Sequence, residues 1–142
     1  MERIAEAHWE GELKTGRGRI KLGSGAYEGD YSFGTRFENA PGTNPEELLG
    51  AAHAGCFTMA LANTLAKGGH PVTRLDTTAT VHLEKVGEGF SITGIDLVTR
   101  GQVPGISREE FQRAAADMGA NCILSRALKA VPIKVEATLL SG

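Results

Sequence analysis

The feature that most constrains the fold of this chain is a long apolar segment with a clear helical start and end. Asn44 is a good N-cap, and Pro45 fits the first position of a helix, where a missing N–H costs nothing. Two glutamates follow, and carboxylates are stabilised near the positive end of the helix dipole. Helical composition continues to Lys67, after which Gly68-Gly69 and Pro71 end it. The sequence therefore predicts a helix of about two dozen residues, about 35 Å long.

This predicted helix is apolar or small on nearly every face. A helix of this kind belongs inside a protein rather than on its surface, and a chain of 142 residues can barely surround it alone. The apolar runs of the chain are interrupted by Gly, His, Asn and Thr, so we expect none of them to span a bilayer. Between Leu48 and Leu65 the markedly polar residues are His53, Thr58, Asn63 and Thr64.

Length, composition and charge limit the classes of protein to which this chain can belong. The length is that of one ordinary domain, so we expect a single domain over residues 1–142. Hydrophobic residues make up 41% and charged residues 23%, which is typical of a soluble globular protein. The net charge of −2 and pI of about 6.1 give no electrostatic case for nucleic acid or an anionic membrane as partner. The first residues are partly acidic and lack an apolar run, so we expect no signal peptide and a cytoplasmic location.

Alternating segments predict strands on both sides of the helix. Residues 5–13 and 19–22 indicate two strands separated by a break at Gly16-Arg17-Gly18, and residues 23–30 indicate a loop. Residues 31–37 alternate aromatic and polar side chains and predict a third strand. After the helix, residues 73–86 and 90–103 alternate around a Gly-Glu-Gly turn, which is typical of a long β-hairpin.

The last third of the chain adds a second helix and a final strand. Ser107 and Glu110 form a capping-box pattern that opens this helix, and Gly119-Ala120-Asn121 interrupts it. Residues 123–129 predict a short helical piece, and residues 133–139 predict a strand. The fold class is therefore α+β, with antiparallel groups of strands at the two ends and helices between them.

The two cysteines invite a chemical explanation. A permanent disulfide is improbable in a reducing compartment, and neither cysteine belongs to a C-x-x-C pair. Four scattered histidines give no zinc signature. The cysteines are then either small buried hydrophobic residues or reactive thiols.

Cys56 lies in the middle of the apolar helix and needs a permanent cation beside it to act as a nucleophile. Arg36 precedes the helix and can supply that charge, although an ordinary solvated strand residue fits the pattern as well. Glu46 is its natural partner, or alternatively only a residue that stabilises the helix dipole. Glu46 lies ten residues before Cys56, about 15 Å along the axis and about 80° around it. If both serve one site, they come from different chains across a two-fold interface.

Three further residues bear on this chemistry. Cys122 follows the break in the second helix, and a thiol at the start of a helical turn is more accessible than one in mid-helix. Cys56 and Cys122 therefore suit a reactive and a resolving thiol. His53 precedes Cys56 by three residues on the same helical face, which permits a Cys–His dyad. Gly55 in mid-helix suggests close approach of another helix or a ligand.

Several segments together carry a resemblance to a known family. The most specific is Gly42-Thr43-Asn44-Pro45-Glu46-Glu47-Leu48-Leu49-Gly50-Ala51-Ala52-His53-Ala54-Gly55-Cys56-Phe57. It is joined by residues 7–11, 35–38, 75–79 and 103–106, and by Cys122 ahead of residues 128–130. In these residues the chain resembles the OsmC (osmotically inducible protein C) branch of the OsmC/Ohr hydroperoxide reductases, over almost its whole length.

The resemblance implies an OsmC-like fold, in which antiparallel sheets wrap around two long central helices of an intertwined homodimer with two interfacial sites. It implies that Cys56 is the peroxidatic cysteine and Cys122 the resolving one. Arg36 and Glu46 match the polar pair that activates the thiol. Neither a metal nor an organic cofactor is expected.

The expected activity is a thiol peroxidase in oxidative or osmotic stress defence. Cys56 would reduce an organic hydroperoxide, and hydrogen peroxide less efficiently, and would then form a disulfide with Cys122. An external dithiol, such as a lipoylated protein, would restore both thiols. Apolar neighbours, namely Phe57, Leu48 and Leu49, would favour organic substrates. Two alternatives stay open: a non-catalytic dimeric stress or ligand-binding protein, and a hydrolase that uses His53 and Cys56.

Overall fold

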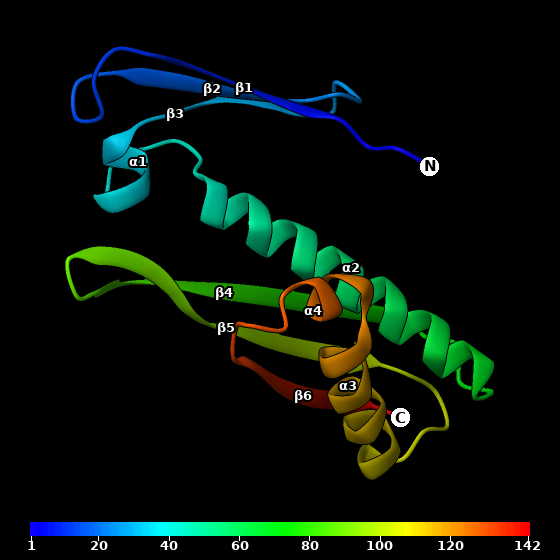
Figure 1. Cartoon of the computed structure of the whole chain (residues 1–142). Helices are drawn as coiled ribbons and strands as arrows, with labels where there is room; N and C mark the ends of the chain where they lie inside the picture. Colours follow the sequence, from blue (N-terminus) through cyan, green and yellow to red (C-terminus); the bar gives the residue numbers. More distant parts are fainter. The chain divides into compact units, whose positions relative to one another are not determined.

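The computed structural model describes residues 1–142 and divides the chain into two compact units, residues 1–48 and residues 49–142 (Figure 1). The boundary falls near the start of the long helix. Each unit has its own three-stranded sheet. The expectation of one domain over the whole chain stays a prediction, and the units are described one at a time.

The first unit begins with an antiparallel sheet in the order β1-β2-β3. Its strands are β1 (Ala5–Glu10), β2 (Arg17–Leu22) and β3 (Glu28–Tyr31). Arg17 and Gly18 therefore lie in a strand rather than in the predicted break, and β3 starts within the predicted loop. Gly18 lies beneath the rings of Trp9 and Tyr31, which leave no room for a side chain at this position. The glycine thus lets two aromatic rings pack against the strand and against each other in a tilted arrangement.

The predicted strand over residues 31–37 is wrong beyond Tyr31. The segment forms a short helix, α1 (Phe33–Phe37), with Ser32 as N-cap. The Ser32 hydroxyl accepts a hydrogen bond from the Thr35 N–H, and the Thr35 hydroxyl accepts one from the Ser32 N–H. This reciprocal capping box stabilises the first turn. A helix is therefore preferred over the strand that the aromatic alternation suggested, and Arg36 lies in its last turn.

The long helix is confirmed as α2 (Pro45–Lys67). The Asn44 side chain accepts a hydrogen bond from the Glu47 N–H, so Asn44 is the N-cap as predicted. The same side chain donates to the Thr35 carbonyl and fixes α1 against the start of α2 within the first unit.

By length and composition α2 is long and apolar enough to span a membrane, so the expectation that no segment passes that test was wrong. The core helix of a globular protein passes the same test. Phe57, Leu61 and Leu65 recur at the spacing of one helical face and are buried in the hydrophobic core of the second unit. This face is packed against protein.

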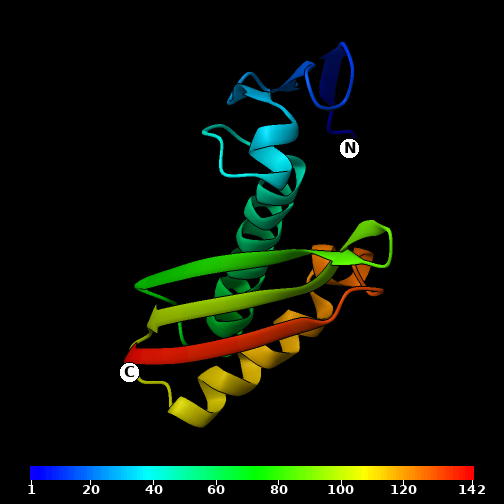
Figure 2. The same cartoon turned by 90° about the vertical axis from the view of Figure 1, so that its left-hand side faces the viewer.

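The second unit contains the sheet β4-β5-β6 (Figure 2). The predicted hairpin is confirmed as β4 (Arg74–Val86) and β5 (Gly89–Gln102), which pair antiparallel. The last strand, β6 (Ile133–Ser141), pairs with β5 in parallel. The prediction of purely antiparallel sheets was therefore wrong for this sheet. The connection from β5 to β6 contains two helices, which is long enough for the crossover that parallel strands need.

Two further helices complete the second unit: α3 (Arg108–Asn121) and α4 (Ile123–Ala127). The Ser107 hydroxyl caps α3, as predicted. Gly119 of α3 lies so close to Val135 of β6 that a Cβ would collide with it, so the glycine lets helix and sheet approach. The core of this unit combines one face of α2 and α3 with one face of the sheet. The site residues of this unit are held by these layers.

Candidate functional site

Arg36 and Glu46 form a two-point ion pair within the first unit. Arg36 Nε lies 3.1 Å from both carboxylate oxygens of Glu46, and Arg36 Nη2 lies 2.7 Å from Glu46 Oε1. The Glu46 side chain is 10% exposed and that of Arg36 is 39% exposed, so the carboxylate is buried while the guanidinium keeps an open edge. The hydrogen bond to Glu46 raises the pKa of Arg36 above its usual value. Arg36 is thus a fixed, permanent cation.

An aromatic cavity of about 290 Å³ lies beside this cation. The Arg36 guanidinium carbon lies 5.2 Å from the centre of the Phe37 ring, and the Phe33 and Phe37 rings are 5.1 Å apart. The cavity therefore offers apolar walls with one positively charged residue among them. Its lining residues are Trp9, Leu13, Tyr31, Ser32, Phe33, Arg36 and Phe37.

Cys56 lies on α2 in the second unit and is a free, half-buried thiol. Its Sγ accepts a hydrogen bond of 3.5 Å from the backbone N–H of Leu124, two residues after Cys122. This contact fixes the position of the Cys56 sulfur beside the first turn of α4. The side chain packs against the same hydrophobic cluster that contains Cys122. The fold thus brings together two cysteines that are far apart in the sequence.

Cys122 caps the N-terminus of α4 and belongs to a buried hydrogen-bond chain. Its Sγ lies 3.1 Å from Ser125 Oγ and accepts a bond of 3.4 Å from the Ser125 N–H. Ser125 Oγ lies 2.8 Å from Nε2 of His53, which is on α2. Cys122, Ser125 and His53 are 3%, 2% and 0% exposed. Burial lowers the pKa of His53, so this ring is held neutral.

One expectation about these residues was wrong. Cys122 was expected to be the more accessible cysteine, but it is buried whereas Cys56 is half-buried, because the Cys122 side chain lies in the hydrophobic core cluster. The alternative of a Cys–His dyad gains no support, because His53 Nε2 is hydrogen-bonded to Ser125 and His53 Nδ1 has no hydrogen-bond partner.

Ser125 was missed by the sequence analysis. The local signal was the spacing of Cys122 and Ser125, which is that of an N-cap and the third residue of a helical turn. Phe57 was expected near the substrate, but it is fully buried in the core. The aromatic residues of the cavity beside Arg36 are better candidates for apolar contacts. No group of three or more His, Cys, Asp or Glu side chains could hold a metal ion.

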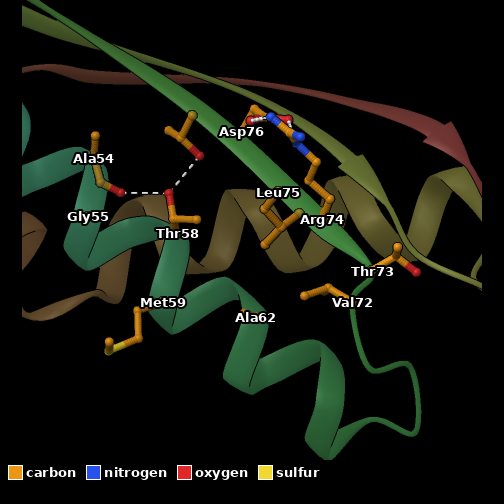
Figure 3. A pocket seen from close by; sticks show the side chains of 11 residues that line it. Ala54, Gly55, Thr58, Met59, Ala62, Val72, Thr73, Arg74, Leu75 and Asp76 are labelled. Atoms are coloured by element: carbon orange, nitrogen blue, oxygen red, sulfur yellow. Dashed lines mark hydrogen bonds and ion pairs between the residues drawn. The ribbon is translucent and has the colours of Figure 1, made fainter.

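An apolar groove of about 690 Å³ runs between α2 and β4 in the second unit (Figure 3). Met59 on its helical wall is 77% exposed, and a Cβ built on Gly55 would meet no atom within 4 Å. Beside the groove the Thr58 hydroxyl oxygen lies 2.7 Å from the Ala54 carbonyl oxygen and 2.7 Å from the Thr77 hydroxyl oxygen. Only 28% of the most apolar 18-residue stretch of α2 is buried by the chain itself. One side of this helix is therefore uncovered.

Comparison with known proteins agrees with this architecture. The chain is 48% identical over 131 residues to Peroxiredoxin OsmC of Escherichia coli (strain K12), covering 92% of each chain, and equally to that of Shigella flexneri. Among solved structures it is similar to OhrB, the organic hydroperoxide resistance protein of Bacillus subtilis. The TM-score is 0.72 and the identity 25%, over 96% of this chain and 97% of that one.

An organic hydroperoxide resistance protein OsmC from Legionella pneumophila shares the fold, with a TM-score of 0.75 and 23% identity over 97% of each chain. The mixed α+β architecture with two small sheets is thus that of solved OsmC and Ohr proteins. The family model described as OsmC-like protein matches residues 37–136. The resemblance read from the sequence is confirmed, and the chain belongs to the OsmC-like protein family.

Proposed function

We propose that this protein is a thiol peroxidase that reduces organic hydroperoxides to alcohols. The observation that carries the proposal is the position of the two cysteines. They share one hydrophobic cluster, and the Cys56 sulfur accepts a hydrogen bond from a backbone N–H of α4, the helix that Cys122 caps. Relatives named peroxiredoxin OsmC and organic hydroperoxide resistance protein support the same activity.

Arg36 keeps Cys56 ionised in this proposal, and Glu46 fixes the plane of the guanidinium by its two-point pair. The Cys56 thiolate attacks the distal oxygen of the hydroperoxide, and the O–O bond breaks. The alkoxide takes a proton and leaves as the alcohol, while Cys56 becomes a sulfenic acid. Cys122 then attacks the Cys56 sulfur, water leaves, and a disulfide forms between them.

The substrate class follows from the cavity beside Arg36. Its walls are aromatic, and burying an alkyl or aryl group there is favourable by about 25 cal/mol per Å² of apolar surface. Hydrogen peroxide has no such group and gains nothing from these walls. Organic hydroperoxides are therefore the preferred substrates, and hydrogen peroxide is reduced less efficiently.

The active protein is an intertwined homodimer in this proposal, with two long helices at its centre. The uncovered apolar side of α2 supports it, because exposed Met59 and the open space at Gly55 offer a face on which a second copy can pack. Residues 1–142 act as a single OsmC-like domain within this dimer. Two sites form at the interface, each with Arg36, Glu46, Cys56 and Cys122.

The remaining parts of the cycle follow from the chemistry. An external dithiol, such as a lipoylated protein, attacks the disulfide and restores both thiols. A reducing compartment maintains that dithiol, so the cytoplasm is the proposed location. The cycle needs no metal or organic cofactor, because sulfur carries both electrons. Its physiological context is oxidative or osmotic stress defence.

The test is consumption of cumene hydroperoxide by reduced protein without added reductant. Wild-type protein should consume one equivalent per chain, and Cys56→Ser should consume none. Cys122→Ser should consume one equivalent without forming a disulfide within the chain, because no second thiol of the chain is left to attack its sulfenic acid. Consumption by Cys56→Ser at the wild-type rate would overturn the proposal, and activity towards esters alone would favour a hydrolase.

A further inference from the structure

A buried hydrogen-bond chain runs from His53 through Ser125 to Cys122, and the steps above use only Cys122. Two hydrogen bonds join it, 2.8 Å from His53 Nε2 to Ser125 Oγ and 3.1 Å from Ser125 Oγ to Cys122 Sγ. All three side chains are at least 97% buried. A serine between an imidazole and a thiol can pass a proton from one to the other, because its hydroxyl both donates and accepts.

His53 keeps one ring nitrogen that no hydrogen bond of the fold uses. Its Nδ1 is buried and has no hydrogen-bond partner, which is unfavourable because a buried polar atom has lost its contact with water. A purely structural position of this kind is better filled by an apolar residue. Burial lowers the pKa of the ring, so the ring is neutral, and in the tautomer with the hydrogen on Nδ1 its Nε2 accepts the hydrogen bond of the Ser125 hydroxyl.

Cys122 needs such a base because it is the buried cysteine. A thiol in apolar surroundings reacts slowly, since only the thiolate is nucleophilic. No carboxylate and no lysine or arginine is hydrogen-bonded to Cys122, Ser125 or His53. The polar neighbours of the Cys122 sulfur are the Ser125 N–H, at 3.4 Å, and the Ser125 hydroxyl, which is itself hydrogen-bonded to His53.

We propose that Ser125 and His53 form a proton relay that activates Cys122 as the resolving nucleophile. This inference rests on the proposed peroxidase function and adds a base for its second step. His53 acts on Cys122 through Ser125 and touches neither the peroxide nor Cys56 Sγ, so it is a positioning and proton-accepting residue of the resolving step.

The resolving step moves one proton from Cys122 to His53. The Cys122 S–H proton moves to Ser125 Oγ while the Ser125 hydroxyl proton moves to His53 Nε2. The Cys122 sulfur forms a bond with the Cys56 sulfur, and the S–O bond of the sulfenic acid breaks. The departing hydroxide takes one proton from solvent and leaves as water, and His53 gives the relayed proton back to solvent, so no net proton is gained or lost. The sulfenic sulfur is reduced and the Cys122 sulfur oxidised, so the products are one disulfide and one water.

The experiment separates the two steps in full-length protein after one equivalent of cumene hydroperoxide. Peroxide consumption reports Cys56, and intact mass after acid quenching reports disulfide closure. In Ser125→Ala and His53→Gln, consumption should stay within about twofold of wild type, while closure should slow about tenfold or more, as for loss of a general base. Thr64→Val is the matched control, because it removes another hydroxyl–sulfur bond, from α2 to Met118 of α3. It should leave both rates unchanged.

The pH profile distinguishes a relay from a packing role. The titratable groups at this cluster are His53 and Cys56 on α2 and Cys122 at the start of α4. Without Ser125, the Cys122 proton must pass to solvent instead of to His53, so the closure rate of Ser125→Ala should rise more steeply with pH than that of wild type. Ser125→Thr keeps the hydroxyl and should restore the flatter wild-type profile.

Closure in Ser125→Ala and His53→Gln with the wild-type rate and profile would overturn the relay and leave the peroxidase intact. Absence of any disulfide in the wild-type protein would instead overturn the proposed function itself.

Discussion

The Arg36 guanidinium and the Glu46 carboxylate join helix α1 to the first turn of α2 through three hydrogen bonds of 2.7 to 3.1 Å. Because Glu46 occupies Nε and Nη2, it turns the Nη1 edge of the guanidinium away from the carboxylate. The pair therefore fixes both the charge and the orientation of Arg36, which is what a mechanism based on thiolate stabilisation requires.

Replacement of Arg36 is expected to lower the fraction of Cys56 present as thiolate at neutral pH. Arg36→Ala removes the permanent cation, and peroxide reduction should slow by about tenfold to about a hundredfold, in line with loss of a charged hydrogen bond. Arg36→Lys keeps the charge but not the two-point geometry, so an intermediate loss is expected. Ultraviolet absorbance of the thiolate and the rate with cumene hydroperoxide are the measurements.

Arg19→Ala is the matched control for Arg36, because Arg19 also pairs with carboxylates in the first unit but lies on the exposed face of β2. It should change neither readout. A normal thiolate fraction in Arg36→Ala would contradict the proposed activation of Cys56.

The aromatic cavity beside Arg36 is expected to select organic substrates. Phe33→Ala should raise the KM for cumene hydroperoxide about tenfold, because a buried aromatic contact contributes about 1.5 kcal/mol or more. The rate with hydrogen peroxide should change much less. Phe90→Ala, at an exposed position beside the β4–β5 turn, serves as the control. Equal losses for both peroxides in Phe33→Ala would mean that the cavity does not bind the organic group.

The open space at Gly55 gives a test of the dimer. In the isolated chain a larger side chain at this exposed helical position meets no neighbour and should stabilise α2 by about 1 kcal/mol through helix propensity alone. If a second copy packs on this face, Gly55→Leu should instead weaken the dimer, which sedimentation would detect as monomer. Gly89→Leu also enters open space, at the start of β5, and should leave the dimer intact. A fully dimeric Gly55→Leu would count against packing at this face.

The lowered pKa of His53 predicts how stability varies with pH. The folded protein holds the ring neutral by burial, whereas the unfolded chain protonates it near pH 6.5. Below about pH 6.5 the unfolded state therefore binds more protons than the folded state, and stability falls as the pH falls. The stability that comes from keeping His53 neutral is fully present above about pH 6.5 and is lost progressively as the pH falls below it.

Urea unfolding of wild type and His53→Gln at about pH 7.5 and about pH 5.5, at one protein concentration, measures this effect. The wild-type midpoint should fall more than the variant midpoint between the two values. Parallel falls would show that His53 does not couple folding to protons.

Local signals in the sequence predicted much of this fold. Asn44 and Pro45 at one end and Gly68-Gly69 at the other gave the bounds of α2, because caps and helix breakers act within a few residues. The long hairpin β4–β5 was equally local. The segment after Tyr31 was read as a strand because its aromatic alternation outweighed the Ser32–Thr35 capping box, a signal that was also present in the sequence.

Contacts between residues that are far apart in the sequence could not be predicted from such local signals. The parallel pairing of β6 with β5 depends on how α3 and α4 pack, and the His53–Ser125 bond joins residues 72 positions apart. Cys122 was expected to be accessible because it caps a helix, but the cap itself lies in the hydrophobic cluster. Burial is set by tertiary packing, and a local pattern does not encode it.

The central claim is that the sulfur atoms of Cys56 and Cys122 together supply the two electrons that reduce one peroxide. The most direct measurement is the intact mass of the reduced protein before and after one equivalent of cumene hydroperoxide, with the alcohol produced measured in the same sample. The account predicts loss of two hydrogen atoms per chain, one alcohol per chain, and full reversal by a dithiol. An unchanged mass, or a stable gain of oxygen without disulfide while both cysteines are present, would contradict it.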